Sequence, residues 1–123
     1  MTSPAEALQA AIVERLKASD TFSRGVVGRI YNANSKELPC AWVGITQSDG
    51  PSDTIELLAT AHIWKSGDEA SVKELSESAQ AILTEAPNAK GLSIKSWEHE
   101  YSEIRLDEET AAYRALVRCR GQA

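Results

Sequence analysis

The side chains that could do acid–base or metal chemistry stand apart from one another in this sequence. The chain has 2 histidines and 2 cysteines among its 123 residues. His62 lies on a predicted strand, too far from Glu56 for the two to hold one metal ion by local spacing. Glu98 and His99 are adjacent, so on a strand they point to opposite faces. Because zinc sites use compact patterns such as His-Glu-x-x-His or paired cysteines, we predict no metal site.

Motifs for nucleophilic catalysis and phosphate binding are also missing. The sequence contains no Gly-x-Ser-x-Gly elbow, and Gly25 and Gly28 do not have the pattern of a phosphate-binding loop. The acidic run 107–109 falls in a predicted turn, where solvation is its simplest role. We therefore predict no catalytic residue, no cofactor and no enzymatic activity.

The bulk composition indicates one folded domain, covering 1–123. The chain is 42% hydrophobic and 25% charged, as is typical of a globular protein. A net charge of -5 argues against nonspecific nucleic-acid binding, which needs a basic surface. Cys40 and Cys119 belong to no paired motif, so we expect two reduced thiols. We expect neither a signal peptide nor a membrane span.

One stretch, from Thr54 to Leu83, organises the remaining elements. Over 54–64 every second residue is apolar, which predicts a strand with one buried face. After Gly67 the apolar spacing becomes helical, and Ser66 with Glu69 forms a capping box for that helix. A strand and a helix joined this closely must pack their apolar faces together.

The segments before this stretch supply one helix and two strands. Ser3 is suited to cap a helix over 4–18. A short strand over 29–31 and a polar loop over 32–37 follow. The next strand opens at Pro39, where a proline is tolerated because it need not donate to the ladder.

Two further strands follow the central helix. The segment 92–104 is extended but changes parity, which predicts a bulge between Ile94 and Trp97. A turn at 107–109 leads into a final strand over 110–120. The hairpins favour an α+β fold, with an antiparallel sheet of about four to five strands and two helices packed on one face.

Tryptophans and arginines are the first candidate interaction residues. Trp42, Trp64 and Trp97 fall opposite the regular apolar parity of their strands, which predicts an aromatic set on the helix-free sheet face. Arg114, Arg118 and Arg120 line one face of the last strand and suit contact with an acidic partner subunit or passage near nucleic acid. The alternatives are packing under loops for the tryptophans and cross-strand pairing with neighbouring glutamates for the arginines.

The segment 47–53 is the second candidate. Its sequence, Gln-Ser-Asp-Gly-Pro-Ser-Asp, is dense in turn formers and should join two strands as an exposed hairpin loop. We interpret it as a contact arm that uses Asp49, Gly50 and Asp53. The alternative is a solvated connector.

Several short segments are informative through their order and spacing. They are 7–16 (Ala-Leu-Gln-Ala-Ala-Ile-Val-Glu-Arg-Leu), 27–31 (Val-Gly-Arg-Ile-Tyr), the Pro39-led strand with Val43-Gly44, 62–64 (His-Ile-Trp) with Glu69-Ala70, and Asp107, Thr110, Tyr113 and Arg114 at the end. Read together, they resemble the tail completion, or tail terminator, family of long-tailed phages and gene transfer agents. The similarity spans nearly the whole chain.

The resemblance implies a structural virion protein without enzymatic activity. Such a protein forms a homohexameric ring that caps the head-proximal end of the tail tube, ends tube growth and joins the tail to the capsid neck. The implied partners are further copies of the chain, the tail tube protein and a neck or head-completion protein. Assembly would take place in the host cytoplasm, without a membrane. DNA would pass through the lumen without specific binding, which suits an acidic molecule.

Two other functions stay open at the level of sequence. A head-completion or neck connector protein would share the ring symmetry but bind on the portal side. An unrelated monomeric binding module or small enzyme would instead have a ligand-sized pocket, for which His62 and His99 are the candidate lining residues.

Overall fold

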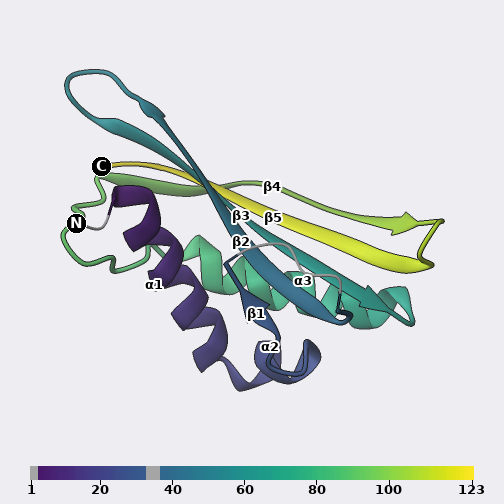
Figure 1. Ribbon diagram of the computed structural model, residues 1–123. Helices are drawn as coiled ribbons and strands as arrows, with labels where there is room; N and C mark the ends of the chain where they lie inside the picture. Colours follow the sequence, from purple (N-terminus) through teal and green to yellow (C-terminus); the bar gives the residue numbers. More distant parts are fainter. Residues whose placement is uncertain (1–2, 33–36) are drawn as a thin grey trace.

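A five-stranded sheet forms the centre of the computed structural model, which describes residues 3–32 and 37–123. The strand order is β1-β2-β3-β5-β4. Helices α1 and α3 cross one face of the sheet, and α2 lies at the end of α1 (Figure 1). The elements are α1 (Pro4–Ala18), α2 (Asp20–Gly25), β1 (Ile30–Tyr31), β2 (Cys40–Asp49), β3 (Ile55–Ser66), α3 (Glu69–Thr84), β4 (Ser96–Asp107) and β5 (Ala112–Gln122). The predicted α+β fold class is confirmed.

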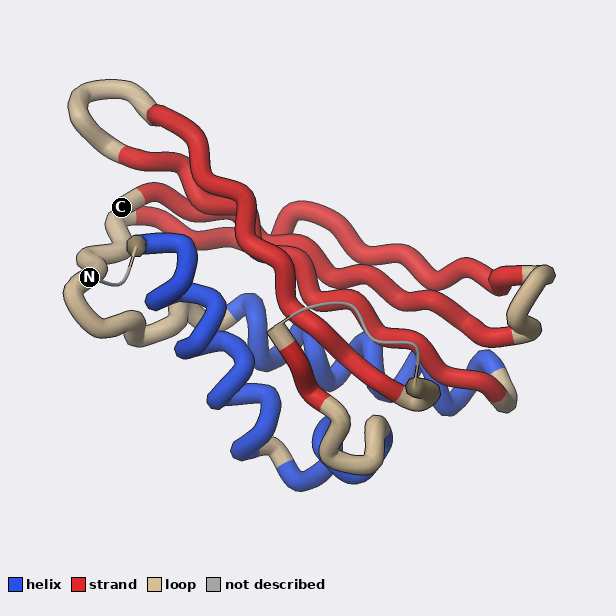
Figure 2. The backbone as a smooth tube through the Cα atoms, viewed as in Figure 1, coloured by secondary structure: helices blue, strands red, loops and turns tan. Residues whose placement is uncertain are grey.

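Strand β3 lies in the middle of the sheet and follows the predicted alternation. It pairs antiparallel with β2 and β5, so that Ala61 lies opposite Val43 on one side and Val117 on the other. These three side chains are fully buried beneath the helices. The opposite face of the sheet carries no helix in the described part of the chain (Figure 2).

Helix α1 forms as the sequence predicts. The Ser3 hydroxyl accepts a hydrogen bond from the backbone N–H of Glu6 at 3.1 Å, which satisfies one of the free donors of the first turn. Leu8, Ile12 and Leu16 recur at helical spacing and are buried against the sheet.

The predicted capping box of α3 is wrong by two residues. Asp68, not Ser66, caps this helix, and its Oδ1 accepts from the backbone N–H of Ser71 at 2.7 Å. The reason is that β3 continues through Ser66. Gly67, at φ 119°, then turns the chain in a conformation that favours glycine, so the helix can begin only afterwards.

Two features of the N-terminal half differ from the expectation. Ser19 starts the short helix α2, which the sequence patterns did not predict, and Phe22 in this helix is fully buried. Strand β1 pairs with β2 in parallel, with Ile30 opposite Ala41, whereas all-antiparallel pairing was expected. Residues 33–36 of the predicted polar loop lie outside the described residues.

The two long hairpins differ from the prediction in their bounds. Strands β2 and β3 continue so far that only 50–54 remain as their loop. The bulge of β4 lies between His99 and Tyr101, not between Ile94 and Trp97, because 92–95 precede the strand. Among the residues that the structure describes, no helix is both long and apolar enough to cross a membrane.

Two glycines in the sheet provide a matched test of this packing. A Cβ added at Gly121 would meet the Trp97 ring and would lie 2.6 Å from the carbonyl oxygen of Ser96, whereas at Gly44 the nearest atom would be 3.5 Å away. We therefore expect Gly121→Ala to lower the free energy of unfolding by about 1–3 kcal/mol. Gly44→Ala should change it by no more than about 0.5 kcal/mol. Urea unfolding of both variants checks this, and equal effects would contradict the register of β4 on β5.

Candidate interaction surface

Five side chains on the helix-free side of the sheet form a surface that we call the aromatic–arginine face. It consists of Trp42 from β2, His62 and Trp64 from β3, and Arg114 and Arg118 from β5. The register pairs Trp42 with His62 and Trp64 with Arg114. The residues on either side of these five in sequence point to the core side of the sheet. The same alternation that builds the core therefore places these five side chains together on the opposite face.

The aromatic rings of this face make two ordered contacts. Trp42 and His62 are stacked, with ring centroids 3.7 Å apart and an interplanar angle of 8°. The guanidinium carbon of Arg114 lies 5.2 Å from the centroid of the Trp64 ring, in the geometry of a cation–π interaction. Two of the three predicted interface tryptophans therefore lie on the helix-free face as expected.

Ring nitrogens on this face remain without hydrogen-bond partners. Trp42 Nε1, Trp64 Nε1 and His62 Nδ1 are buried and bond to no group among the residues that the structure describes. A buried indole N–H without an acceptor costs about 1–3 kcal/mol, so such groups are uncommon in a surface selected for stability alone.

The surroundings of His62 keep its imidazole neutral. Burial, followed by the nearby positive charges of Arg114 and Arg118, lowers its pKa to about 4. At neutral pH the face therefore carries the two arginine charges and an uncharged, stacked histidine.

Cross-strand pairing, the alternative predicted for the arginines, is observed for Arg120. Its guanidinium bonds to Glu56 at 2.9 Å and to Glu100 at 3.1 Å. Both carboxylates come from neighbouring strands, so the charge of Arg120 is compensated. Another pair joins Arg105 to Glu103 at 3.0 Å, but both residues lie on β4, so this pair is not cross-strand.

Arg114 and Arg118 are different. Arg118 Nε donates to the hydroxyl of Thr60 at 3.3 Å, and Arg114 lies over Trp64. Neither arginine forms an ion pair with a carboxylate of 3–32 or 37–123. No carboxylate of the described chain therefore lies within ion-pair distance of either cation. Arg114 does act on Glu103 at longer range, since a hydrogen bond from Tyr101 and then the charges of Arg105 and Arg114 lower the pKa of that carboxyl.

The β2–β3 hairpin projects beyond the rest of the sheet (Figure 1). Its neighbour β5 ends there, where the backbones of Ile55 and Ala123 bond to each other. We call residues 49–53 the acidic tip. Asp49 and Asp53 are exposed, and neither forms an ion pair with the residues described. The tip is ordered by a bond from the Gly50 N–H to the Thr54 carbonyl at 2.9 Å.

The prediction that Trp97 belongs to the helix-free face is wrong. Its indole N–H donates to the carbonyl of Leu83 in α3 at 2.6 Å, and its ring packs against the core. The misplaced bulge explains the error: Ile94 precedes β4 and so does not set the parity of that strand.

Sequence reasoning also missed two contributors to the surface. His62 was considered as a metal ligand and as a pocket-lining residue but not as part of this surface, and Thr60 was not singled out at all. Their roles depend on which residues lie opposite them in β2 and β5, which a strand pattern alone does not contain. The period-two spacing of Thr60, His62 and Trp64 was the available signal.

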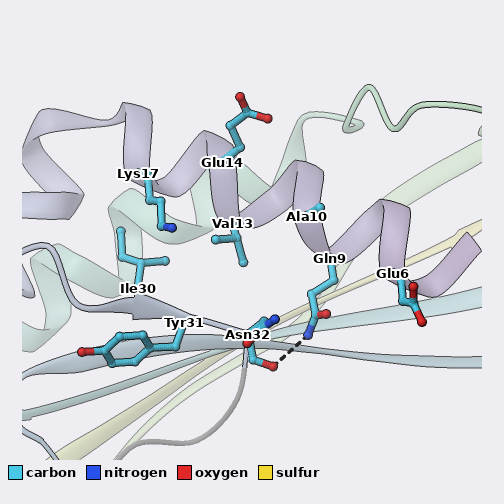
Figure 3. A pocket seen from close by; sticks show the side chains of 9 residues that line it. All are labelled: Glu6, Gln9, Ala10, Val13, Glu14, Lys17, Ile30, Tyr31 and Asn32. Atoms are coloured by element: carbon cyan, nitrogen blue, oxygen red, sulfur yellow. Dashed lines mark hydrogen bonds between the residues drawn. The ribbon is translucent and has the colours of Figure 1, made fainter. Parts of the chain in front are cut away.

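A groove of about 870 Å³ lies between α1 and β1 (Figure 3). Gln9 uses its amide in a structural role there, donating to the carbonyls of Asn32 at 2.9 Å and Val43 at 2.7 Å. Among the described residues of the groove there is no serine, cysteine or histidine. They are Glu6, Gln9, Ala10, Val13, Glu14, Lys17, Ile30, Tyr31 and Asn32.

The two histidines do not share a pocket. His62 lies on the helix-free face, whereas His99 bonds to the Ser102 hydroxyl, which in turn bonds to Gln80 of α3. A ligand site lined by both histidines, expected for a monomeric module, is therefore contradicted. Within 3–32 and 37–123, no group of three or more histidine, cysteine or acidic side chains is arranged to hold a metal ion.

The whole fold is similar to that of solved viral and virus-like proteins. A chain from the virion of a native gene transfer agent particle superposes with a TM-score of 0.80 at 17% identity, over 99% of this chain and 98% of that chain. The gp17 protein of bacteriophage SPP1 superposes with a TM-score of 0.69 at 17% identity, over 97% of this chain and 90% of that one. The sequence itself matches no protein-family model and, at a significant level, no curated protein.

The neutral state of His62 predicts a specific pH dependence of stability. The pKa of about 4 in the folded chain lies below the ordinary value of 6.5, so between these values the unfolded chain binds more protons. Stability should therefore fall as the pH is lowered through this window, by on the order of 2 kcal/mol after allowing for partial exposure. Urea unfolding from about pH 7 to about pH 4.5 measures this.

The variant His62→Phe keeps an aromatic ring in the stack but removes the titration. Its unfolding free energy should depend less on pH than that of the wild type, and His99→Gln serves as the control. Parallel pH profiles for the wild type and His62→Phe would contradict a neutral, buried His62.

Proposed function

We propose that the protein is a tail terminator. In this proposal it forms a homohexameric ring at the head-proximal end of a tail tube, ends tube growth and joins the tail to the capsid neck. The observation that carries the proposal is the end-to-end fold similarity to a chain of a gene transfer agent virion. The similarity to SPP1 gp17 supports it independently.

The surface of the chain supports a role in assembly. A ring requires a heterologous contact, in which two different patches of neighbouring subunits meet and the rotation closes. The aromatic–arginine face and the acidic tip supply two such patches. We assign the subunit contacts to Trp42, Trp64, Arg114 and Arg118 on the face and to Asp49, Gly50 and Asp53 on the tip.

The charge of the chain fits a conduit for DNA. The net charge of -5 disfavours nonspecific retention of phosphates by the lumen wall. This requires the two unpaired arginines to be covered by a neighbouring subunit. A lumen lined by Arg114 and Arg118 would contradict this part of the proposal.

The proposal predicts that the protein forms closed rings and caps tubes. Light scattering across a concentration series, with negative-stain images of the same samples, should give rings of about six subunits. Added during polymerisation of the cognate tail tube protein, the rings should bind at one end and stop elongation there.

Two results would contradict the proposal. A protein that stays monomeric and is not recruited to tube ends would exclude a terminator. A ring that binds the portal or head-completion protein but ignores tube ends would identify a neck connector instead.

A further inference from the structure

We propose that the ring contact joins the acidic tip of one copy to Arg114 and Arg118 on the aromatic–arginine face of the next copy. The inference rests on the proposed function, because it takes a second copy of this chain as the partner. Beyond the proposed function, the inference specifies which two patches meet. It thereby also specifies the direction in which subunits follow one another around the ring.

The two patches of one chain lie too far apart to bind each other. Arg114 is paired with Trp64 near the end of β3, whereas the tip precedes Ile55 at its start. At a rise of about 3.3 Å per residue, Arg114 lies roughly 30 Å along the strand from Ile55, and Arg118, which is opposite Thr60, lies roughly 17 Å from it. The contact must therefore be made between copies, and because the patches differ, it is head-to-tail.

The charges of the two patches are complementary. The segment 47–54 contains Asp49 and Asp53 and no lysine or arginine. Across from it in the proposed contact lie two guanidinium groups that form no ion pair with a carboxylate of the described chain. The charge of the nearby Arg120 is already compensated by Glu56 and Glu100. The attraction for an acidic tip is therefore concentrated at Arg114 and Arg118.

Both patches are ordered before they meet, which lowers the entropic cost of association. Trp64 holds the guanidinium of Arg114 in place, and Thr60 holds that of Arg118. In the tip, the N–H of Thr54 donates to the carbonyl of Pro51 at 3.1 Å, alongside its hydroxyl. Arginine and carboxylate groups in such a setting bind through charge-assisted hydrogen bonds.

Charge exchange tests the contact. The face variant Arg114→Glu/Arg118→Glu places like charges together. The tip variant Asp49→Lys/Asp53→Asn places one positive charge against the arginines and removes the second carboxylate. Asparagine is used at 53 because Asp53 has a φ of 63°, which asparagine tolerates. The concentration at which half of the protein is in rings should rise at least about tenfold for each variant. A chain carrying all four changes should return to within about threefold of the wild type.

A matched control places the same kind of charge change elsewhere. Glu74→Lys/Glu77→Lys alters two exposed acidic residues of α3, and it should leave ring formation unchanged. Circular dichroism and urea unfolding establish that every variant is folded. If the face double variant does not fold, Arg114→Glu alone replaces it, since Arg114 is exposed and should shift ring formation in the same direction.

The outcomes separate this inference from the function on which it rests. Wild-type rings that are insensitive to both sets of changes, or not restored by their combination, would overturn the tip-to-face contact and leave the terminator proposal standing. An equal loss of rings in the α3 control would attribute the effect to net charge and would also overturn the contact. Absence of rings in the wild type, with and without tube ends, would overturn both proposals.

Discussion

The alternation of β3 is the constraint on which the rest of the structure depends. Every second residue of this strand enters the core, where Ala59, Ala61 and Ile63 are fully buried under the helices. The residues between them must then lie on the opposite face, whatever their chemistry. Because β3 is flanked on both sides by antiparallel partners, the same division extends to β2 and β5.

This division leaves polar and aromatic groups on a face that the described helices do not cover. Stacked rings gather there, together with indole N–H groups and arginines that have no hydrogen-bond or ion-pair partner, respectively, among the carboxylates and other groups of the described residues. The hairpin tip, at the far end of the same ladder, carries the opposite charge. The same set of paired strands therefore carries a positive patch and a negative patch at separate places. A ring subunit needs two such different patches, because each copy must bind its neighbour through unlike surfaces.

Much of the fold was predictable from local patterns. The long alternation of β3, the capped amphipathic α1 and the helical spacing of α3 each follow from a short-range rule that tertiary packing reinforces. Helix α2 was missed because its 6 residues are too few to show a helical repeat of apolar residues. Its formation depends on the burial of Phe22 in the core. The parallel pairing of β1 was missed because partners distant in sequence decide it.

The candidate surface was predictable only where parity sufficed. Trp42 and Trp64 were assigned to the correct face by counting along their strands. Trp97 was not, because the count was taken from Ile94, which precedes β4, and the start of that strand depends on how it pairs with β5. The stack of Trp42 on His62 requires the cross-strand register, which no pattern within one strand reveals.

The most direct test of the account is electron cryo-microscopy of cognate tail tubes assembled with this protein. The account predicts a closed ring of copies at the head-proximal tube end, with the helix-free sheet face of each subunit covered by its neighbour. Tube ends without the protein, or copies bound with this face open to solvent, would contradict it.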